Sequence, residues 1–598
     1  MNRLSLYAYL LSATIVLLSS VVYYPKWKKS GTEATLSWDV SGYYLYLPAA
    51  IVYHDIKELN WWPDIERKYQ PGPGMGQAFK HSSGNYVMKY PMGQALQFMP
   101  WFLTAHVLAE PLGYAPNGFS RPYQVAIGIG SLLIALLGMW LLRNILLRYF
   151  NDRTTAIVLI SIALGSNYLE YAGITGAMTH NWLFTLNCLL ILASIRFYQK
   201  PGYAIAAAIG LLVGWATITR PTEILSALIP LLWGISSWKD LSPRLQLYKQ
   251  FWPKILLAGS VAFGVMLWQS IYWKYATGEW IVYSYEEQGF TWFPPHIEDV
   301  LWSAKAGWLV YSPIMLLAVA GLFMLRKQLP KVFPAVAVYC LLALYVTSAW
   351  DIWWYGGSLG QRAMVQAYPL WAFCLGAFWV WAWKQSWSRW LFSGLSLVCI
   401  YLSIWWCHQA HKGGQFHAEQ MTRRYILTVL GKWNKQTDDL KYLDTRDKFS
   451  GHQRQDVKLL AMQDFEQDSS AVITEQSPIS GKKSARLTAE HAFTPAIRLP
   501  NPGLPYLWLR ASATFRCEAK EWEIWAMTQF TVRFKQGDRI LKDRIIRLQR
   551  HVDGGELKTI DFDTFVPQEP FDQVEVFLWN PGSNKAVWVD DIKVEGFH

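Results

Sequence analysis

Charged side chains are scarce in this chain of 598 residues. Lys, Arg, Asp and Glu make up only 16% of it, whereas 52% is hydrophobic and the aromatic residues include 34 Trp, 32 Tyr and 28 Phe. This composition is too apolar for an ordinary soluble protein of the same length. A membrane protein is therefore the first class to consider, with a more polar region that begins near residue 410.

Signals of several other classes are missing. The formal net charge is +12, but the basic residues occur mainly in short loops and in the tail, without a basic helix or zinc spacing, so nucleic acid is not an expected partner. The six cysteines lie almost wholly in apolar segments without metal spacing, so no disulfide framework follows. The oxidising compartment outside the cytoplasm would permit disulfides. The chain also lacks a Walker motif and a nucleotide-binding Gly-rich turn after a strand.

Apolar segments of about 20 residues, the length that crosses a bilayer, recur throughout the first two thirds of the chain. The first, 4–24, favours an uncleaved span over a signal peptide, because its apolar run is long and no small-x-small cleavage site precedes Pro25. Further candidates lie near 92–112, 122–142, 154–171, 178–197, 203–219, 222–238, 254–273, 306–325, 331–349, 363–383 and 388–407.

The basic residues decide between these candidates, because Lys and Arg in short loops stay on the cytoplasmic side. If the segment 92–112 crossed the membrane, several basic loops would lie outside; if it lies in the outer interface, they return to the cytoplasm. Its Pro100 and Pro111 also suit an interfacial helix. We therefore predict a polytopic α-helical membrane protein with about eleven spans and its N-terminus inside.

This topology defines the outer face, where the chemistry is to be sought. The first outer loop is expected over 25–121, the transmembrane region over 1–410, and the tail also outside. Further outer loops are expected near 170–179, 219–222, 274–305 and 350–362. No internal repeat is visible, which weakens the interpretation as an inverted-repeat transporter.

The tail has a different pattern. After a predicted linker with some helix over 411–455, short runs of alternating apolar and polar residues are separated by turns, which predicts an all-β jelly-roll or sandwich domain over 456–598. The ending Val587-Trp-Val-Asp-Asp-Ile-Lys-Val-Glu595 resembles the last strand of carbohydrate-binding jelly-roll domains. Its Asp590 and Asp591 are expected to cap the strand or hold a calcium ion, with direct sugar contact as the alternative.

Four motifs in the outer loops carry a second resemblance. They are Ser37-Trp-Asp-Val-Ser-Gly-Tyr-Tyr-Leu-Tyr-Leu-Pro48, Lys89-Tyr-Pro-Met-Gly-Gln-Ala-Leu96, Ser166-Asn-Tyr-Leu-Glu-Tyr171 with Met178-Thr-His-Asn181, and Trp350-Asp-Ile-Trp-Trp-Tyr-Gly-Gly-Ser-Leu-Gly-Gln-Arg362. Over roughly residues 5–405 the chain resembles the GT-C membrane glycosyltransferases, which include protein O-mannosyltransferases and the lipid A aminoarabinose transferase. The resemblance implies a polyprenyl-phosphate sugar donor and transfer to a hydroxyl of a glycan, lipid or protein acceptor on the outer face.

Two carboxylates are the catalytic candidates. Asp39 matches the acidic position that the family carries in its first outer loop, which implies a general base; the alternative is an N-cap for the helix that begins at Val40. Glu170 lies where many members carry a second acidic residue, which implies acceptor contact or metal ligation. His180 is a weaker companion, since a lone His at the end of a span is usually a packing residue.

Three cations are candidates for the donor phosphate. Arg220 and Arg362 lie at predicted outer ends of spans, where an Arg needs a partner, and a lipid phosphate offers bidentate geometry. Either Arg could instead form a structural ion pair with Asp351 or Glu223. Lys89 is the third candidate, and the predicted topology gathers all three cations on one membrane face together with the two carboxylates.

No residues near Asp39 have the spacing of metal ligands, so the sequence requires no cofactor and favours a mechanism without metal, while a divalent metal stays possible. One alternative function is a surface-glycan ligase or polymerase with a diphosphate-linked donor. The other is a non-enzymatic transporter or flippase with a sugar-binding tail, whose ionisable residues would be expected in mid-span. The expected location is the bacterial inner membrane, among membrane lipids, with a periplasmic tail.

Overall fold

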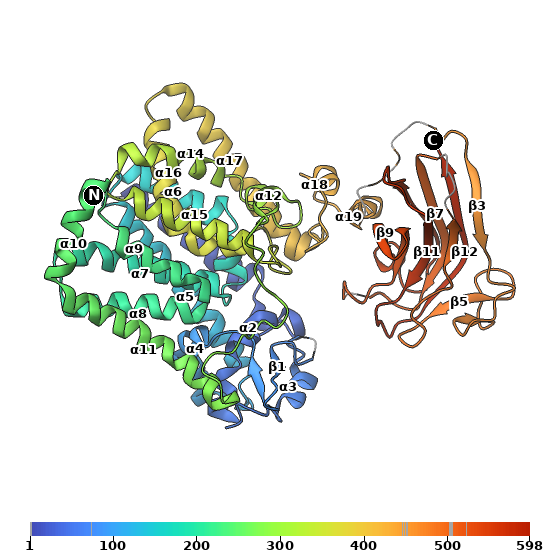
Figure 1. Cartoon of the computed structure of the whole chain (residues 1–598), viewed down its shortest axis with the longest axis horizontal. Helices are drawn as coiled ribbons and strands as arrows, with labels where there is room; N and C mark the ends of the chain where they lie inside the picture. Colours follow the sequence, from blue (N-terminus) through green and yellow to red (C-terminus); the bar gives the residue numbers. More distant parts are fainter. Residues whose placement is uncertain are drawn as a thin grey trace. The chain divides into compact units, whose positions relative to one another are not determined.

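The computed structural model describes residues 3–598 except 73, 445–446, 448, 450–452, 501–505 and 522. The chain divides into two compact units, Met1–Lys412 and Gly413–His598. The first unit is built from helices and the second mainly from β-strands (Figure 1). The predicted order, with apolar helices first and strands last, is therefore confirmed.

Long apolar helices form most of the first unit. They are α1 (Arg3–Leu18), α5 (Arg121–Leu146), α6 (Asp152–Gly165), α7 (Thr179–Gln199), α8 (Tyr203–Thr219), α11 (Trp252–Thr277), α14 (Met315–Gln328), α15 (Phe333–Ala349), α16 (Tyr368–Ala382) and α17 (Ser386–His408). Among the described residues, six helical stretches are long and apolar enough to cross a membrane, and Tyr203–Thr219, Pro221–Leu232 and Phe333–Ala349 are shorter apolar helices. These helices make the chain an integral membrane protein, and the count of about eleven spans stays a prediction.

Burial distinguishes the helices at the centre of this unit from those at its periphery. In an apolar window of Arg362–Ala382, 94% of the residues are buried, whereas only 11% are buried in that of α11, which exposes Phe263 and Trp268. An apolar helix that the protein does not cover is stable where lipid covers it. Helices α8 and α11 lie side by side (Figure 1), so one side of α11 packs on α8 and its opposite side faces outward.

The segment between α1 and α5 folds into short elements instead of one long helix. They are α2 (Trp38–Tyr44), α3 (Trp62–Tyr69), the two-stranded sheet of β1 (Ala78–Lys80) and β2 (Tyr86–Met88), and α4 (Gly93–Ala109). Helix α4, which the sequence analysis placed in the interface, contains Pro100. It packs against α5 and α8, so the start of α4 lies beside the end of α8.

The second unit is a two-sheet β-sandwich. One sheet has the order β10-β7-β12-β5-β4, with β3 also paired to β12, and the other has the order β6-β11-β8-β9. The strands are β3 (Lys458–Gln463), β4 (Ile473–Thr474), β5 (Ser484–Leu487), β6 (Ile497–Pro500), β7 (Trp508–Cys517), β8 (Gln529–Gln536), β9 (Arg539–Arg547), β10 (Leu557–Phe565), β11 (Gln573–Trp579) and β12 (Val587–Phe597). Alternate residues of β7 are buried, and Phe515 meets Phe530 of the other sheet.

The residues that precede the sandwich contact it. Helix α19 (Lys441–Asp444) ends at Asp444, which forms ion pairs with Arg547 and Arg550. Asp447 accepts hydrogen bonds from Lys542 at 2.6 Å and from Arg544 at 3.0 Å. The boundaries predicted at 410, 411–455 and 456 stay predictions, but these described residues are fixed to the strands by charge-assisted bonds.

The acidic pair of β12, Asp590 and Asp591, takes part in the structure of the sandwich. Asp590 is fully buried and its Oδ2 accepts hydrogen bonds from the hydroxyl of Ser484 at 2.7 Å and from the backbone N–H of Ser480 at 3.2 Å. A buried carboxylate needs such donors. Asp591 has a left-handed φ of 51° where the register of β12 shifts. The contacts of Asp590 hold the turn before β5 and leave it no exposed oxygen for a sugar.

Candidate active site

A cavity of about 270 Å³ opens in the first unit between the short elements after α1, the end of α8 and the loops before η8 (Arg362–Ala367). Its charged lining residues are Asp39, Lys89, Arg220 and Arg362, and much of the rest is aromatic. The aromatic lining residues are Tyr43, Tyr90, Tyr283, Tyr285, Phe290, Trp350 and Tyr355. Four of the six residues that the sequence proposed for the site therefore share one cavity.

Asp39 reaches the cavity from the first turn of α2. Ser37, and not Asp39, occupies the N-cap position of this helix. The opposite face of α2 is anchored by Tyr44, which is fully buried and whose ring contacts those of Phe98 and Phe102 in α4. Because one face of the short helix is fixed in this way, the carboxylate of its first turn is held toward the cavity.

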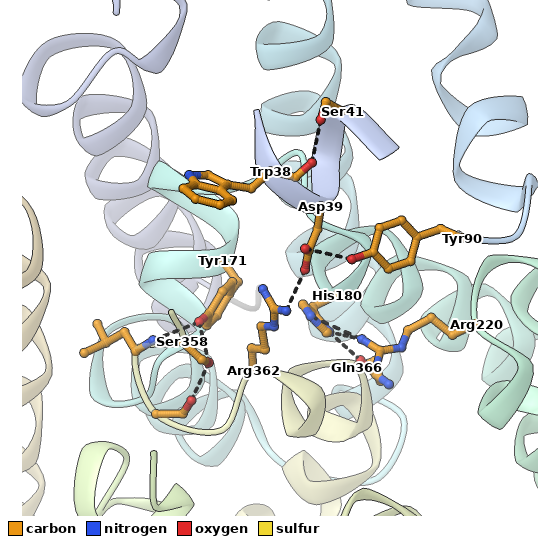
Figure 2. Close-up of polar contacts among 12 residues, drawn as sticks. Trp38, Asp39, Ser41, Tyr90, Tyr171, His180, Arg220, Ser358, Arg362 and Gln366 are labelled. Atoms are coloured by element: carbon orange, nitrogen blue, oxygen red, sulfur yellow. Dashed lines mark hydrogen bonds and ion pairs between the residues drawn. The ribbon is translucent and has the colours of Figure 1, made fainter. Parts of the chain in front are cut away.

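Both oxygens of Asp39 accept charge-assisted or hydroxyl hydrogen bonds, as Figure 2 shows. Tyr90 donates its hydroxyl to Oδ1 at 2.8 Å, and Arg362 donates Nη2 to Oδ2 at 2.6 Å. Gly42 makes the first contact possible, because a Cβ at this position would lie 2.7 Å from the Tyr90 ring. Asp39 thus acts as an acceptor for two side chains from distant elements and not as a helix cap.

The charge state of Asp39 follows from these neighbours. Burial by itself raises the pKa of the carboxyl, but the Arg362 guanidinium and the hydrogen bond from Tyr90 outweigh it and hold the pKa below the usual value. Conversely, burial and the Asp39 charge raise the pKa of Tyr90 well above its usual value. Asp39 is therefore ionised at neutral pH and Tyr90 keeps its proton as a donor.

The Gly-rich loop that precedes Arg362 has an unusual backbone. Gly356, Gly357 and Gly360 have φ values of 50°, 48° and 64°, the left-handed region that side chains with a Cβ disfavour. A Cβ on Gly360 would also lie 2.8 Å from the Cβ of Tyr311, whereas one on Gly357 would meet nothing within 4 Å. The loop needs glycine for its backbone, and at position 360 also for space.

The motif around residue 170 anchors this loop. Asn167 donates its amide to the carbonyls of Leu359 and Gln361 at 3.3 and 3.2 Å, and the Tyr171 hydroxyl accepts from the Leu359 N–H at 3.1 Å. Figure 2 shows Tyr171 against Ser358, beside Arg362. These contacts fix the backbone from which Arg362 extends, so the direction of its guanidinium is determined by both motifs.

Three cations in this cavity face one carboxylate. Arg362 pairs with Asp39, but its buried Nε has no hydrogen-bond partner in the part of the chain that the structure describes. Arg220, which follows α8, contacts His180 and lies 5.3 Å from the centre of the Tyr355 ring. No ion pair of Arg220 or Lys89 occurs among the described residues. The cavity thus has excess positive charge and an unused donor, which suits an anion.

The ion pairs weighed as alternatives for the two arginines are not formed within the described residues. Asp351 instead accepts from the Gly289 N–H at 2.8 Å and the Thr291 hydroxyl at 2.7 Å. Glu223 accepts from Tyr339 at 2.9 Å and Gln366 at 2.8 Å. Both arginines therefore keep guanidinium groups directed at the cavity.

Two candidate residues do not line the cavity. Glu170 begins η5 (Glu170–Ile174), is 4% exposed, and bonds through Oε2 to Nε2 of His411 at 2.8 Å. His180 is fully buried at the start of α7, behind Arg220. Neither position offers direct contact with a molecule in this cavity, so contact of Glu170 with an acceptor and of His180 with a phosphate stay predictions from the sequence.

Sequence reasoning did not select the tyrosines that complete the cavity. Tyr90 and Tyr355 lie inside quoted motifs, yet only Lys89 and Arg362 were chosen from these motifs, and no residue was chosen from the outer loop that contains Tyr285. The contact of Tyr90 with Asp39 joins residues 51 positions apart. A tyrosine that faces a carboxylate has no local sequence pattern that distinguishes it from a belt tyrosine.

Comparisons with known proteins found similar solved structures at low identity and low TM-score. No family model matches the chain, and no curated protein matches it. Two similar solved structures are a Family 16 Carbohydrate Binding Module-2 (15% identity, TM-score 0.16, 20% of this chain and 82% of that one) and the CBM22-1 xylan-binding domain of Paenibacillus barcinonensis Xyn10C (14%, TM-score 0.17, 24% and 96%). The chain is also similar to the arabinosyltransferase EmbB from Mycobacterium smegmatis, at 11% identity and a TM-score of 0.33, over 97% of its own length and 64% of that protein's.

Proposed function

We propose that this protein is a membrane glycosyltransferase of the GT-C type, which moves a sugar from a polyprenyl-phosphate donor to an acceptor hydroxyl on the outer face of the bacterial inner membrane. The observation that carries the proposal is the cavity in which one ionised carboxylate, Asp39, meets three cations and a wall of aromatic rings. Cations suit a phosphate leaving group, a carboxylate suits a hydroxyl proton, and rings suit stacking on a sugar.

The chemistry assigns a part to each group. The acceptor oxygen forms a bond to the anomeric carbon, while the bond from that carbon to the phosphate oxygen breaks and its electron pair leaves with the polyprenyl phosphate. Asp39 takes the acceptor proton. Arg220, Arg362 and Lys89 neutralise the negative charge that grows on the leaving phosphate.

The ion pair between Asp39 and Arg362 implies an exchange during this reaction. A carboxylate that is held by a guanidinium at 2.6 Å is a weak base. A donor phosphate offers Arg362 a second anion and competes with Asp39 for it. We propose that donor binding draws Arg362 from Asp39, so the carboxylate becomes a better base only when the sugar donor is in place.

A second function shares part of this support. A glycan ligase or polymerase with a diphosphate-linked donor would need two arginines that act together, and Arg220 and Arg362 do line one cavity. The two functions differ in the number of phosphates that the donor brings. Monophosphate- and diphosphate-linked donors compared side by side therefore separate them.

The decisive experiment supplies the purified full-length protein with monophosphate-linked and diphosphate-linked polyprenyl sugars. It measures binding by native mass spectrometry and turnover as released polyprenyl phosphate or polyprenyl diphosphate. Turnover of a monophosphate donor supports the proposal, and turnover of diphosphate donors alone supports the ligase. The same assay with and without a chelator tests the possibility of a divalent metal.

Transport is tested in liposomes that contain the protein and a labelled lipid-linked sugar. Movement of the intact lipid between leaflets, with no release of the sugar from its phosphate, would identify a flippase and overturn the proposed function. The ionisable cavity residues lie beside short elements and loops, and not in the middle of the long helices, which supports transfer.

A further inference from the structure

We infer that Glu223, Gln366 and His180 form a hydrogen-bond chain that positions the Arg220 guanidinium, and that His180 acts in it as a neutral imidazole protonated on Nδ1. The inference rests on the proposed function, because it makes these three buried groups positioning residues for a cation that binds the donor phosphate. Neither Glu223 nor Gln366 lines the cavity.

The chain is continuous in space although its members are far apart in sequence. Gln366 donates Nε2 to Glu223 Oε1 at 2.8 Å, and its Oε1 lies 2.8 Å from His180 Nδ1. Nη1 of Arg220 lies 3.3 Å from Nε2 of the same imidazole and 3.4 Å from Nδ1. Figure 2 shows His180 between Gln366 and Arg220.

The acidic end of the chain determines its direction. Both carboxyl oxygens of Glu223 accept hydrogen bonds, one from Tyr339 and one from Gln366, so Gln366 turns its NH₂ toward Glu223 and its side-chain carbonyl oxygen toward His180. The nitrogen of His180 that faces this oxygen must then carry the proton, which assigns Nδ1–H. Arg220 Nη1 lies almost equally far from both ring nitrogens and does not select between them, but a cation at this distance favours a neutral imidazole.

The reverse arrangement creates a conflict. A flipped Gln366 would place its side-chain carbonyl oxygen against the oxygen of Glu223 that now accepts its NH₂. Because the Tyr339 hydroxyl donates to the other oxygen of Glu223, the flipped amide would leave the first oxygen without this donor.

Further contacts hold the acidic end in place. Glu223 Oε2 accepts from the Tyr339 hydroxyl at 2.9 Å, and Asn187 donates to the Tyr339 hydroxyl oxygen at 3.1 Å and to the backbone carbonyl of Gln366 at 2.9 Å. Each of these residues is at most 4% exposed. Burying a carboxylate with no ion pair among the described residues costs free energy, so the arrangement needs a purpose beyond packing.

The placement of the chain in the fold supplies that purpose. Glu223 lies three residues after Arg220 in η6 (Pro221–Ala227), and Gln366 lies four residues after Arg362 in η8. The bond between Glu223 and Gln366 therefore ties together the two elements that begin beside the two cavity arginines. We expect it to set the separation of the two guanidinium groups as well as the direction of Arg220.

The kinetic test compares Gln366→Leu with Glu223→Gln. Gln366→Leu breaks the chain at its centre, so we expect the donor KM to rise about tenfold while kcat changes less than about threefold. Glu223→Gln keeps an acceptor oxygen for Gln366 and should preserve the donor KM within about threefold, because an amide there maintains the direction of the chain. Gln328→Leu is the control: it makes the same substitution and removes a part-buried bond, to the Ala377 carbonyl at 2.8 Å.

The spectroscopic test does not depend on activity. In full-length protein labelled with ¹⁵N-histidine, the His180 signal is identified as the one lost in His180→Asn, and its two nitrogen shifts report the tautomer. A neutral ring with its proton on Nδ1 is expected. An imidazolium or a proton on Nε2 would overturn the inference, even if the enzyme transfers sugar.

Affinity for polyprenyl phosphate without a sugar separates failure of this inference from failure of the proposed function. Gln366→Leu should weaken this binding about tenfold and Gln328→Leu should not. Equal binding by wild type and Gln366→Leu would overturn the positioning role. A wild-type protein that binds the lipid and shows the Nδ1–H tautomer, but transfers no sugar, would refute the glycosyltransferase function and leave the chain as the support of a lipid-phosphate site.

Discussion

Replacing Asp39 by Asn removes the proposed base and keeps the shape of its side chain. The amide oxygen can still accept from Tyr90 or from Arg362, but it cannot take a proton at neutral pH. Removal of a general base lowers kcat by about 10²–10⁴-fold, which corresponds to about 3–5 kcal/mol of transition-state stabilisation. We therefore expect kcat of Asp39→Asn to be about 10²–10⁴-fold lower than that of wild type.

The affinity of Asp39→Asn for the donor should not fall with its turnover. The substitution ends the competition for Arg362, whose ion pair with Asp39 spans 2.6 Å in wild type. The freed guanidinium is then available to a phosphate, so the donor affinity should be unchanged or higher. The side chains of the pair are only 17% and 24% exposed, so loss of the charge beside a mostly buried guanidinium should lower the free energy of unfolding by about 1–3 kcal/mol.

The assay measures polyprenyl phosphate released from a lipid-phosphate sugar over a range of pH. The pKa of Asp39 is held below its usual value, so in wild type kcat/KM, which reports the free enzyme, should decline only in acid below about pH 4. If the donor draws Arg362 away, the decline in kcat should occur at a higher pH. Both acid limbs should vanish in Asp39→Asn.

The matched control is Asp64→Asn, which removes a carboxylate from the same outer segment, where Asp64 pairs with Arg67 and both side chains are about 80% exposed. Its turnover should equal that of wild type. If Asp39→Asn and Asp64→Asn both turn over as fast as wild type, Asp39 is not the base. If Asp39→Asn instead loses donor affinity in proportion to turnover, Asp39 belongs to donor recognition and the exchange mechanism is wrong.

Three further changes test other parts of the structure. Tyr90→Phe removes a hydrogen bond that lowers the pKa of Asp39, so the acid limb of kcat/KM should move up by about one pH unit. Gly360→Ala should destabilise the Arg362 loop more than Gly357→Ala, by about 1–3 kcal/mol, because only position 360 also lacks space for a Cβ; thermal unfolding and transfer assays measure this. Asp447→Asn should lower the free energy of unfolding of the C-terminal unit by about 1 kcal/mol at neutral pH, measured by proteolysis of the full-length protein in urea.

Each of these three predictions has an outcome that would contradict it. An unmoved pH profile in Tyr90→Phe would show that this hydroxyl does not tune Asp39, and equal stability of the two glycine variants would remove the steric argument. The pKa of Asp447 is lowered to about 2 by Lys542 and Arg544 against the effect of burial. Its contribution should therefore be present above pH 4 and be lost as pH falls toward 2, and a wild-type stability that is flat across this window would refute the ion-pair account.

The sequence alone predicted the class and order of the two units because their signals are local. A run of apolar residues long enough to cross a bilayer, as in α5 and α11, is visible within about 20 positions. The alternation in β7 is visible within ten residues, since neighbours on a strand face opposite sides. The sequence also indicated a helix after Asp39 and an interfacial helix near 92–112, but not how short the first one is, because α2 has only seven residues and depends on its contacts with α4.

The candidate site was predicted in part, through residue types that are costly beside a membrane. Asp39, Arg220 and Arg362 stand out in sequence because a charge near an apolar segment needs a partner. Which partner each one takes was not visible: Arg362 pairs with Asp39 across 323 positions, and Glu170 bonds with His411 across 241. Glu170 was the second catalytic candidate, expected to contact the acceptor or ligate a metal, yet it does not line the cavity.

What the sequence by itself determined was therefore the solvent of each segment, lipid or water, since the free energy of transfer depends on the composition of a short stretch. The tertiary structure decided which charges meet. Packing of α2, α7, η6 and η8 brings distant donors and acceptors within 3.5 Å, so Asp39 is held by Arg362, and Gln366 is held between Glu223 and His180. Hydrogen bonds act only at such distances, so no pattern along the chain can specify them before it folds.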